Sequence, residues 1–301
     1  MFKHILVPLD GSSLAEAALP AAAYLARMLP ARVTLIHIIE QDAAATVHGE
    51  RHLILAEEAE KYLKDVASQA FIPEVAVVCH VHVEATSNVP RAIVDHQDEL
   101  TPDLIVMCTH GKSGLRRVLF GNIAQQVVAF GHIPLLLIRP DEEAPSKQFS
   151  CDMILAPTDG DSVHEQGLVV ACKLARVTGA KLHLLSVVPT AGVLSGQDAT
   201  TQRFMPGTTS TILDMAEEEL CAYLQQQMVQ IQPQNVVVSA EVRRGEPAAV
   251  IAEVAETANA SLIVLGTHGR AGTKAFWRDS IGAKVVTQTK RPLLLVPVKS
   301  A

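Results

Sequence analysis

The apolar residues of this chain come in short runs that alternate with amphipathic stretches. In the first half the runs are rich in Val, Ile and Leu and nearly uninterrupted, which is typical of strands buried on both faces of a parallel sheet. The expected strands are residues 5–9, 33–39, 75–83, 104–108 and 135–138. The expected helices are residues 14–28, 53–67, 89–98 and 123–130. Pro20 falls inside the first of these helices and should kink it or trim its start.

This alternation of strand and helix predicts an α/β fold. Parallel strands need crossover connections, and right-handed crossovers place helices on both faces of the sheet. We therefore expect a doubly wound α/β fold with five parallel strands in each half of the chain.

The halves are copies of one pattern. Residues 4–12 read HILVPLDGS and residues 153–161 read MILAPTDGD, which lie 149 positions apart with five of the nine residues identical. Residues 103–114 (DLIVMCTHGKSG) return as residues 261–272 (SLIVLGTHGRAG) at an offset of 158. The second half must therefore be longer between the two blocks, and the Gly, Ser and Thr-rich stretch 189–211 is expected to be a mobile loop that holds the extra residues.

The length of 301 residues agrees with two domains at about 150 residues each. We expect the first domain at residues 1–142 and the second at residues 150–301, joined by a polar connector over residues 141–150. A hydrophobic content of 49% with 19% charged residues is sufficient for buried cores. The net charge of −7 argues against a nucleic-acid partner, since phosphate binding needs clustered Lys and Arg.

Compartment and membrane association follow from what the sequence lacks. No apolar stretch reaches the roughly 18 residues of a membrane span, and the first apolar run is broken by Pro8 and Asp10 before it could serve as a signal peptide. Five scattered cysteines without a C-x-x-C pair fit a reducing compartment and no structural disulfide. We expect a soluble cytoplasmic protein with no membrane partner.

Candidate chemistry lies at the strand ends, because an open α/β sheet binds ligands beyond the carboxyl ends of its strands where the strand order reverses. The first strand of each half runs into Pro-x-Asp-Gly, although Asp and Gly could simply make the turn while Ser12 or Ser13 caps the next helix. The fourth strand ends in Thr-His-Gly, and a loop then leads to a helix opening at Asn122 or Ser280. Such a helix start offers free N–H groups and a positive dipole end to a phosphate chain.

With these motifs the chain closely resembles a tandem universal stress protein, with two such domains in one chain. The resemblance rests on VPxDGS, LIVxxTHG and PLLLV together and covers nearly the whole sequence twice. It implies a strand order of 3-2-1-4-5 in each domain and ATP as ligand, with or without Mg²⁺. It also implies a phosphate-binding pattern G-x2-G-x9-G-[S/T] after the fourth strand.

Carried over to this sequence, the resemblance implies two sets of nucleotide-binding residues. The first-half site comprises Pro8, Asp10, Ile38 and Met107 around the adenosine and Gly111, Gly121, Asn122 and Ile123 around the phosphates. The second-half site comprises Pro157, Asp159, Val187, Leu265, Gly266, Gly269, Ser280 and Ile281.

Both halves depart from the family pattern. In the first half Cys108 replaces the opening Gly, and Asn122, a good N-cap, replaces the Ser or Thr. In the second half Asp279 stands where the last Gly belongs, and its carboxylate would repel phosphate. The sequence therefore predicts nucleotide binding preferentially in the first half, unless position 108 needs a positive φ angle that only Gly adopts easily.

These features favour a stress-response regulatory module that binds adenine nucleotide and hydrolyses it slowly at most, with no catalytic residue assigned. A scaffold that has lost nucleotide binding and acts through protein partners is the alternative. An adenylating enzyme on a related fold is less favoured, because Asp10-Gly11-Ser12-Ser13 lacks paired glycines and no Walker A loop is present. The halves should pack as an intramolecular pseudo-dimer through their apolar closing strands, and two chains could pair again as a homodimer.

Several histidines suggest a metal-binding site as a further alternative. His80 and His82 share a strand face, and Cys108 and His110 could join them. In the order 3-2-1-4-5, however, two strands separate these groups, or about 14 Å. We therefore predict no metal site there, with His80 and His82 near a sheet edge and His48, His52 and His96 on the surface.

Overall fold

The computed structural model describes residues 1–109, 121–140, 148–161, 165–190, 206–268 and 280–298. In the first half, five strands lie in the spatial order β5-β2-β1-β6-β7, all parallel. They are β1 (His4–Pro8), β2 (Arg32–Glu40), β5 (Val77–Thr86), β6 (Leu104–Cys108) and β7 (Leu135–Ile138). Strands β6 and β7 have the bounds that the apolar runs predict, because every residue in them is buried.

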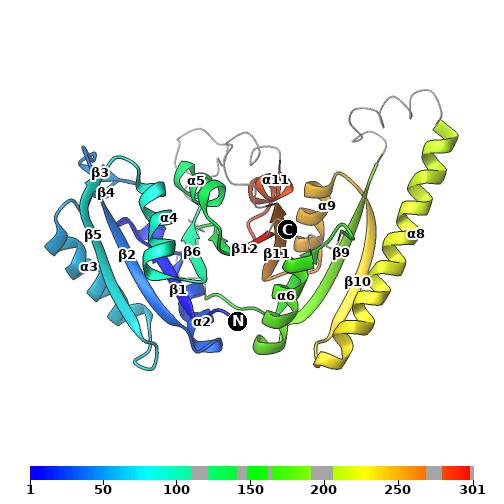
Figure 1. The fold of residues 1–301 in the computed structure, drawn as a ribbon, viewed down its shortest axis with the longest axis horizontal. Helices are drawn as coiled ribbons and strands as arrows, with labels where there is room; N and C mark the ends of the chain where they lie inside the picture. The colour runs from blue at the N-terminus through cyan, green and yellow to red at the C-terminus, as the bar shows by residue number, and fades with distance from the viewer. Residues whose placement is uncertain (110–120, 141–147, 162–164, 191–205, 269–279, 299–301) are drawn as a thin grey trace. The chain divides into compact units, whose positions relative to one another are not determined.

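Helices cover both faces of this sheet (Figure 1). They are α1 (Ser13–Glu16), α2 (Leu19–Met28), α3 (Ala56–Ala70), α4 (Val89–Leu100) and α5 (Asn122–Phe130). Helix α2 packs beside α3, and α4 beside α5 on the opposite face. This arrangement confirms the doubly wound fold and the order 3-2-1-4-5.

Pro20 trims the first helix as expected. Helix α1 ends at Glu16, and α2 begins at Leu19 with Pro20 in its first turn. Proline has no N–H to return to the carbonyl of the fourth residue before it, which here is Glu16. The ladder is therefore interrupted at Ala17 and Ala18, although both keep right-handed helical angles.

The second half repeats the order as β10-β9-β8-β11, with β12 as its fifth strand. Its strands are β8 (Met153–Pro157), β9 (Lys181–Pro189), β10 (Val238–Gly245), β11 (Leu262–His268) and β12 (Leu293–Val298). Its helices are α6 (Glu165–Thr178), α8 (Pro206–Ile231), η3 (Gln232–Gln234), α9 (Pro247–Thr257) and α11 (Ile281–Gln288). Helices α8 and α9 lie on opposite faces of this sheet (Figure 1).

The extra length of the second half lies in a helix, not in a loop as predicted. Helix α8 has 26 residues where its counterpart α3 has 15. Residues 206–211, part of the predicted loop, already belong to α8, and residues 191–205 lie outside the described residues. Thr and Ser lower helix propensity by only a few tenths of a kcal/mol each, so packing of α8 along β9 and β10 outweighs the composition.

The chain divides into two compact units. The first takes in residues 1–150 together with Pro292–Pro297, and there β12 pairs antiparallel with β7, placing Leu294 opposite Leu136. The second takes in Cys151–His268 and residues 280–291. None of the helices in the described part of the chain combines the length and hydropathy that a membrane-spanning helix needs. All five cysteines are free thiols.

Candidate functional site

The strand order of the first unit reverses between β1 and β6. Strand β1 pairs with β2 on one side and with β6 on the other, all in parallel. The carboxyl ends of these strands therefore meet at one edge, where ligands of open α/β sheets bind. The structure brings the predicted residues on these three strands, and directly after β1, to that edge. They are Pro8, Asp10, Ile38 and Met107, of which Ile38 and Met107 are buried and Pro8 and Asp10 half-buried.

Asp10 is held by the turn in which it lies. Its Oδ1 accepts hydrogen bonds from the backbone N–H of Ser12 at 2.9 Å and from the Ser12 hydroxyl at 2.6 Å. The Ser12 hydroxyl oxygen in turn accepts from the N–H of Ala15 at 3.2 Å and so caps α1. The interpretation of this motif as a turn with a serine cap is therefore correct. The other carboxylate oxygen of Asp10 remains directed at His48, whose Nε2 lies 3.7 Å away.

A small hairpin that the sequence analysis missed lies over this turn. Strands β3 (Thr46–Val47) and β4 (Glu50–Arg51) pair antiparallel, and the two residues between them, His48 and Gly49, both have positive φ angles. Positive φ at both central positions is the signature of a type I′ hairpin, and a His-Gly dipeptide was the available signal. The hairpin places the carboxylate of Glu50 at 3.0 Å from the N–H of Ser13 and 2.7 Å from its hydroxyl, both of which donate to it.

A tyrosine and a glutamate behind the turn recur in both halves and were also missed. In the first half Tyr62 of α3 donates to Glu16 at 3.0 Å, and in the second Tyr223 of α8 donates to Glu165 at 3.2 Å. Burial, followed by the nearby Glu16 charge, raises the pKa of Tyr62, so its hydroxyl stays protonated. These pairs tie the helix after the second strand to the helix after the first.

The last residue of β6 is a buried cysteine, Cys108. Cys108 is 2% exposed, and its thiol lies 3.6 Å from the carbonyl oxygen of Ala15, to which it donates. Burial, followed by the charge of Asp10, raises the pKa of Cys108, which keeps it a neutral thiol. Neither Cys108 nor its counterpart Gly266 has a positive φ angle, so the cysteine causes no backbone strain. Gly111 lies outside the described residues.

Helix α5 starts beyond this edge. Its N-cap is Gly121 with φ −58° and ψ 142°, not Asn122 as the sequence suggested, and no described side chain caps it. The first backbone N–H groups of a helix have no partner inside the helix, so this end can donate to an anion. Ile123 follows in the first turn with 40% of its surface exposed.

The second half presents the same edge with different contacts. Pro157 is the last residue of β8 and Asp159 follows the strand, where its Oδ1 accepts from the N–H of Asp161 at 3.1 Å. Helix α11 begins after Ser280, whose hydroxyl oxygen accepts from the N–H of Ala283 at 3.2 Å. The other predicted residues are placed as follows: Val187 half-buried on β9, Leu265 buried and Gly266 half-buried on β11, and Ile281 exposed on α11. Gly269 and Asp279 lie outside the described residues.

Histidine positions correct part of the sequence interpretation. Strand β5 is an edge strand, so His80 and His82 lie at a sheet edge as predicted, and two strands, β2 and β1, separate them from β6. His96 and His52, predicted on the surface, are only 3% and 7% exposed, and His48 is half-buried. His110 lies outside the described residues.

His37 holds the turn after β1 through hydrogen bonds of its ring to two backbone carbonyl groups. Its ring nitrogens lie 2.8 Å from the carbonyl oxygen of Leu9 and 2.9 Å from that of Leu53, and it is 1% exposed. Leu53 also covers Gly11, whose φ of +89° and lack of space for a Cβ require glycine. The turn that bears Asp10 is therefore fixed on both sides.

The comparisons with known proteins agree over both halves. The model of the "Universal stress protein family" matches residues 1–139 and 152–297. A universal stress protein of Mycolicibacterium smegmatis is 25% identical over 307 residues, covering 97% of this chain and 96% of its own. One from Methanocaldococcus jannaschii is 33% identical over 145 residues, covering 46% of this chain and 83% of its own. The fold is that of a universal stress protein crystal structure from Archaeoglobus fulgidus, with a TM-score of 0.69 at 17% identity over 99% of this chain and 97% of that one.

Proposed function

This chain belongs to the universal stress protein family in both of its halves, and we propose that it is a stress-response regulatory protein that binds ATP, chiefly in the first half. In this proposal the nucleotide acts as a ligand, with or without Mg²⁺. The protein would act in the cytoplasm, as a pseudo-dimer within one chain that can pair again as a homodimer.

One observation carries the proposal: the start of α5 lies at the sheet edge where the strand order reverses and has no described side-chain cap. Its first N–H groups could donate to phosphate oxygens, with the positive end of the helix dipole behind them. Asp10 lies at the carboxyl end of β1, beside β6, and its carboxylate can accept hydrogen bonds from ribose hydroxyls.

The preference for the first half rests on a difference between the two helix starts. Ser280 already occupies the N–H of Ala283 at the start of α11, whereas α5 has only Gly121 at the matching place. The sequence adds Asp279 directly before Ser280. A carboxylate about 4 Å from a phosphate charge costs on the order of 4 kcal/mol at an effective dielectric constant near 20. This corresponds to roughly a thousandfold loss of affinity.

The test replaces Gly121 in the full chain by Asp or by Asn, two side chains of nearly the same shape that differ in charge. The φ and ψ angles of Gly121 suit any residue, and both Asp and Asn are good N-caps, so both variants should fold. Calorimetric titration with ATP should show roughly a thousandfold weaker binding for Gly121→Asp than for Gly121→Asn. Equal affinities in the two variants would contradict a phosphate position at the start of α5.

Hydrolysis is proposed to be slow, because none of the described residues at the first-half edge is an evident general base beside a phosphate chain. The carboxylates described there, Asp10 and Glu50, are engaged by Ser12 and Ser13. A turnover near the enzyme median of about 10 per second in a phosphate-release assay would overturn this part of the proposal.

A scaffold without nucleotide is the second candidate, and one observation favours it. Glu50 already binds the N–H and hydroxyl of Ser13 at the start of α1, so the turn after β1 is satisfied within the chain. If neither the wild type nor Asp279→Gly bound ATP, the scaffold would replace the leading proposal.

A further inference from the structure

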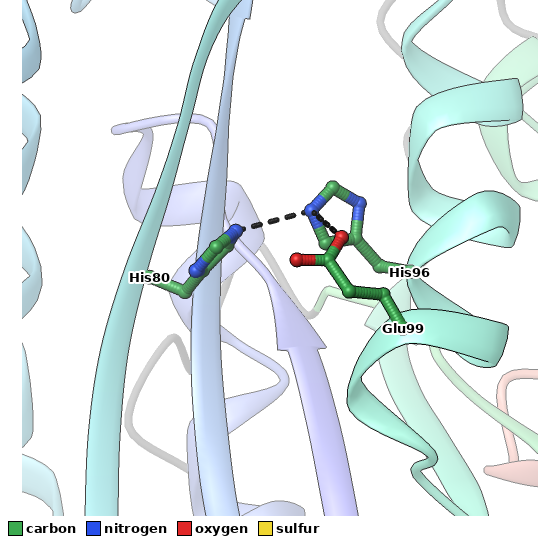
Figure 2. Close-up of side chains that lie close together, drawn as sticks. All are labelled: His80, His96 and Glu99. Atoms are coloured by element: carbon green, nitrogen blue, oxygen red, sulfur yellow. Dashed lines mark hydrogen bonds and ion pairs between the residues drawn. The ribbon is translucent and has the colours of Figure 1, made fainter.

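A second polar cluster lies between the outermost strand of the first unit and the helix that covers it. His80 is on β5, the edge strand of the first unit, and His96 and Glu99 are on α4 (Figure 2). Residues three apart on a helix share a face, so Glu99 is directed to the same place as His96. The described residues hold no other group of three His, Cys, Asp or Glu side chains that meet this closely.

We propose that His80, His96 and Glu99 form a binding site for one Zn²⁺ ion. The potential ligand atoms all lie within 4.8 Å of one another. His80 Nε2 is 3.1 Å from His96 Nε2, which is 3.5 Å from a Glu99 carboxylate oxygen. Zinc bonds of 2.0–2.2 Å at tetrahedral angles separate neighbouring ligand atoms by about 3.3 Å. The cluster therefore already has nearly the spacing that the ion requires.

The backbone of α4 fixes which nitrogen of His96 is available. Nδ1 of His96 lies 2.7 Å from the carbonyl oxygen of Ala92, and since a carbonyl only accepts, Nδ1 carries the proton. In the neutral ring Nε2 then has a lone pair, and it is the nitrogen directed at His80 and Glu99. Histidine ligands of zinc commonly donate their other nitrogen to a carbonyl in this way. Burial of His96 at 3% exposure holds the ring in this orientation.

The chemistry of the ligands selects the metal. Two imidazole nitrogens and one carboxylate oxygen suit zinc, whereas Mg²⁺ and Ca²⁺ prefer oxygen ligands alone. A water molecule would complete the tetrahedron, because Glu99 and the edge of β5 are accessible to solvent. The ion would join β5 to α4, and β5 pairs with a single strand, β2. Zinc binding should therefore stabilise the outer edge of the first unit.

His82 forms the wall of the site. Its ring centre lies 5.1 Å from that of His96 in an edge-to-face arrangement, one pleat along β5 from His80. It is not part of the group whose ligand atoms converge. His82→Gln is therefore expected to keep zinc affinity within a few-fold of wild type.

The experiment is a zinc titration of the metal-free full-length protein, by calorimetry and by competition with a chromophoric chelator. His80→Gln, His96→Gln and Glu99→Gln should each remove the same high-affinity equivalent. The expected loss is on the order of a hundredfold or more, at least that of removing an outer-shell partner. Glu99 is 64% exposed, so Glu99→Gln should fold even if the buried His96 variant does not.

The matched control is His183→Gln in the second half. His183 also pairs with a carboxylate, Glu241 at 3.1 Å, but its other ring nitrogen is bonded to Ser239, and no second imidazole joins it among the described residues. The His183→Gln variant should still bind the one high-affinity equivalent of zinc. With Co²⁺ as probe, the tetrahedral visible absorption should disappear only in the three ligand variants. Equal zinc affinity in wild type and Glu99→Gln, or an equal loss in His82→Gln or His183→Gln, would overturn the assignment.

Discussion

The two halves differ most clearly where the helix after the first strand crosses the fourth strand. In the second half α6 is continuous, and a Cβ added to Gly167 would lie 2.5 Å from the backbone nitrogen of Gly266. In the first half the corresponding positions hold Ala18 and Cys108, and the helix is interrupted at Ala17 and Ala18. The absence of a Cβ at Gly167 thus lets α6 approach the backbone of β11 closely in the second half. In the first half the buried thiol of Cys108 donates to the carbonyl of Ala15 on α1.

This comparison explains how the first half accommodates Cys108 where the family pattern has glycine. Its φ angle is not positive, and its thiol bonds to the carbonyl of Ala15, so the departure from glycine is accommodated by packing behind the sheet edge. In the proposed site, the N–H groups at the start of α5 contact the phosphates, and Cys108 does not. The first half can therefore lack the opening glycine and still present the helix start that the proposal requires.

The largest stability effect is expected from Gly167→Ala. The added methyl would meet backbone atoms of Gly266, which cannot move aside as a side chain can. Overpacking of this kind costs about 3 kcal/mol of unfolding free energy. Urea denaturation should report the loss in the second unit, while Val169→Ala, at an exposed position of the same helix, should leave stability within about 0.5 kcal/mol. An unchanged midpoint for Gly167→Ala would show that the close approach of α6 and β11 is not required.

A smaller loss is expected from the tyrosines that the two halves share. Tyr62→Phe and Tyr223→Phe each remove a hydrogen bond to a glutamate, a charged acceptor, at a cost of about 1.5 kcal/mol. Tyr223→Phe also removes a longer contact of 3.4 Å to Thr158, but Tyr62 should be the costlier of the two, because Glu165 keeps a second donor in Gln227 at 3.2 Å. Thermal denaturation of both variants measures the difference. A larger effect in Tyr223→Phe would contradict the ranking.

The smallest effect is a pH dependence that comes from His4 in the first half. Burial, followed by the charge of Arg32, lowers the pKa of His4, and the corresponding position in the second half is Met153. A lowered histidine pKa means that the unfolded chain binds the proton more readily than the folded one. The contribution of neutral His4 is therefore fully present above about pH 6.5 and is lost as the pH falls below it.

His4→Met, which supplies the second-half residue, should flatten the fall of unfolding free energy between about pH 7 and pH 5. Denaturation at several pH values measures the slope for variant and wild type. A variant slope equal to that of the wild type would assign the pH dependence to other groups.

The sequence predicted most of the sheet, because strands buried on both faces carry a signal that burial alone creates. Residues 104–108 and 135–138 were predicted with correct bounds for this reason. The hairpin at Thr46–Arg51 was missed, since two-residue strands have no periodicity to detect. His96 was misplaced although its spacing from Ala92 and Ile93 puts it on the apolar face of α4, and that spacing was the available signal.

The candidate site was less predictable than the fold. The turn residues Asp10 and Ser12 could be predicted, because Asp and Ser act locally through their own backbone. Glu50 and Tyr62 could not, since each acquires its role only when an element distant in sequence is packed against it. The zinc cluster could not be predicted either, because it forms only when α4 packs against β5 and brings His96 and Glu99 to His80.

The most direct test of the account is the stoichiometry of ATP in the full-length chain, measured by calorimetry on the wild type and on Asp279→Gly. The account predicts a single ATP for the wild type, bound in the first half, and a second ATP after Asp279→Gly removes the charge before α11. Asp279→Asn should give an intermediate gain, since it removes the charge but keeps a side chain. Two results together would contradict the assignment of the nucleotide to the first half. They are an ATP affinity that Gly121→Asp leaves unchanged and an ATP stoichiometry that Asp279→Gly does not raise.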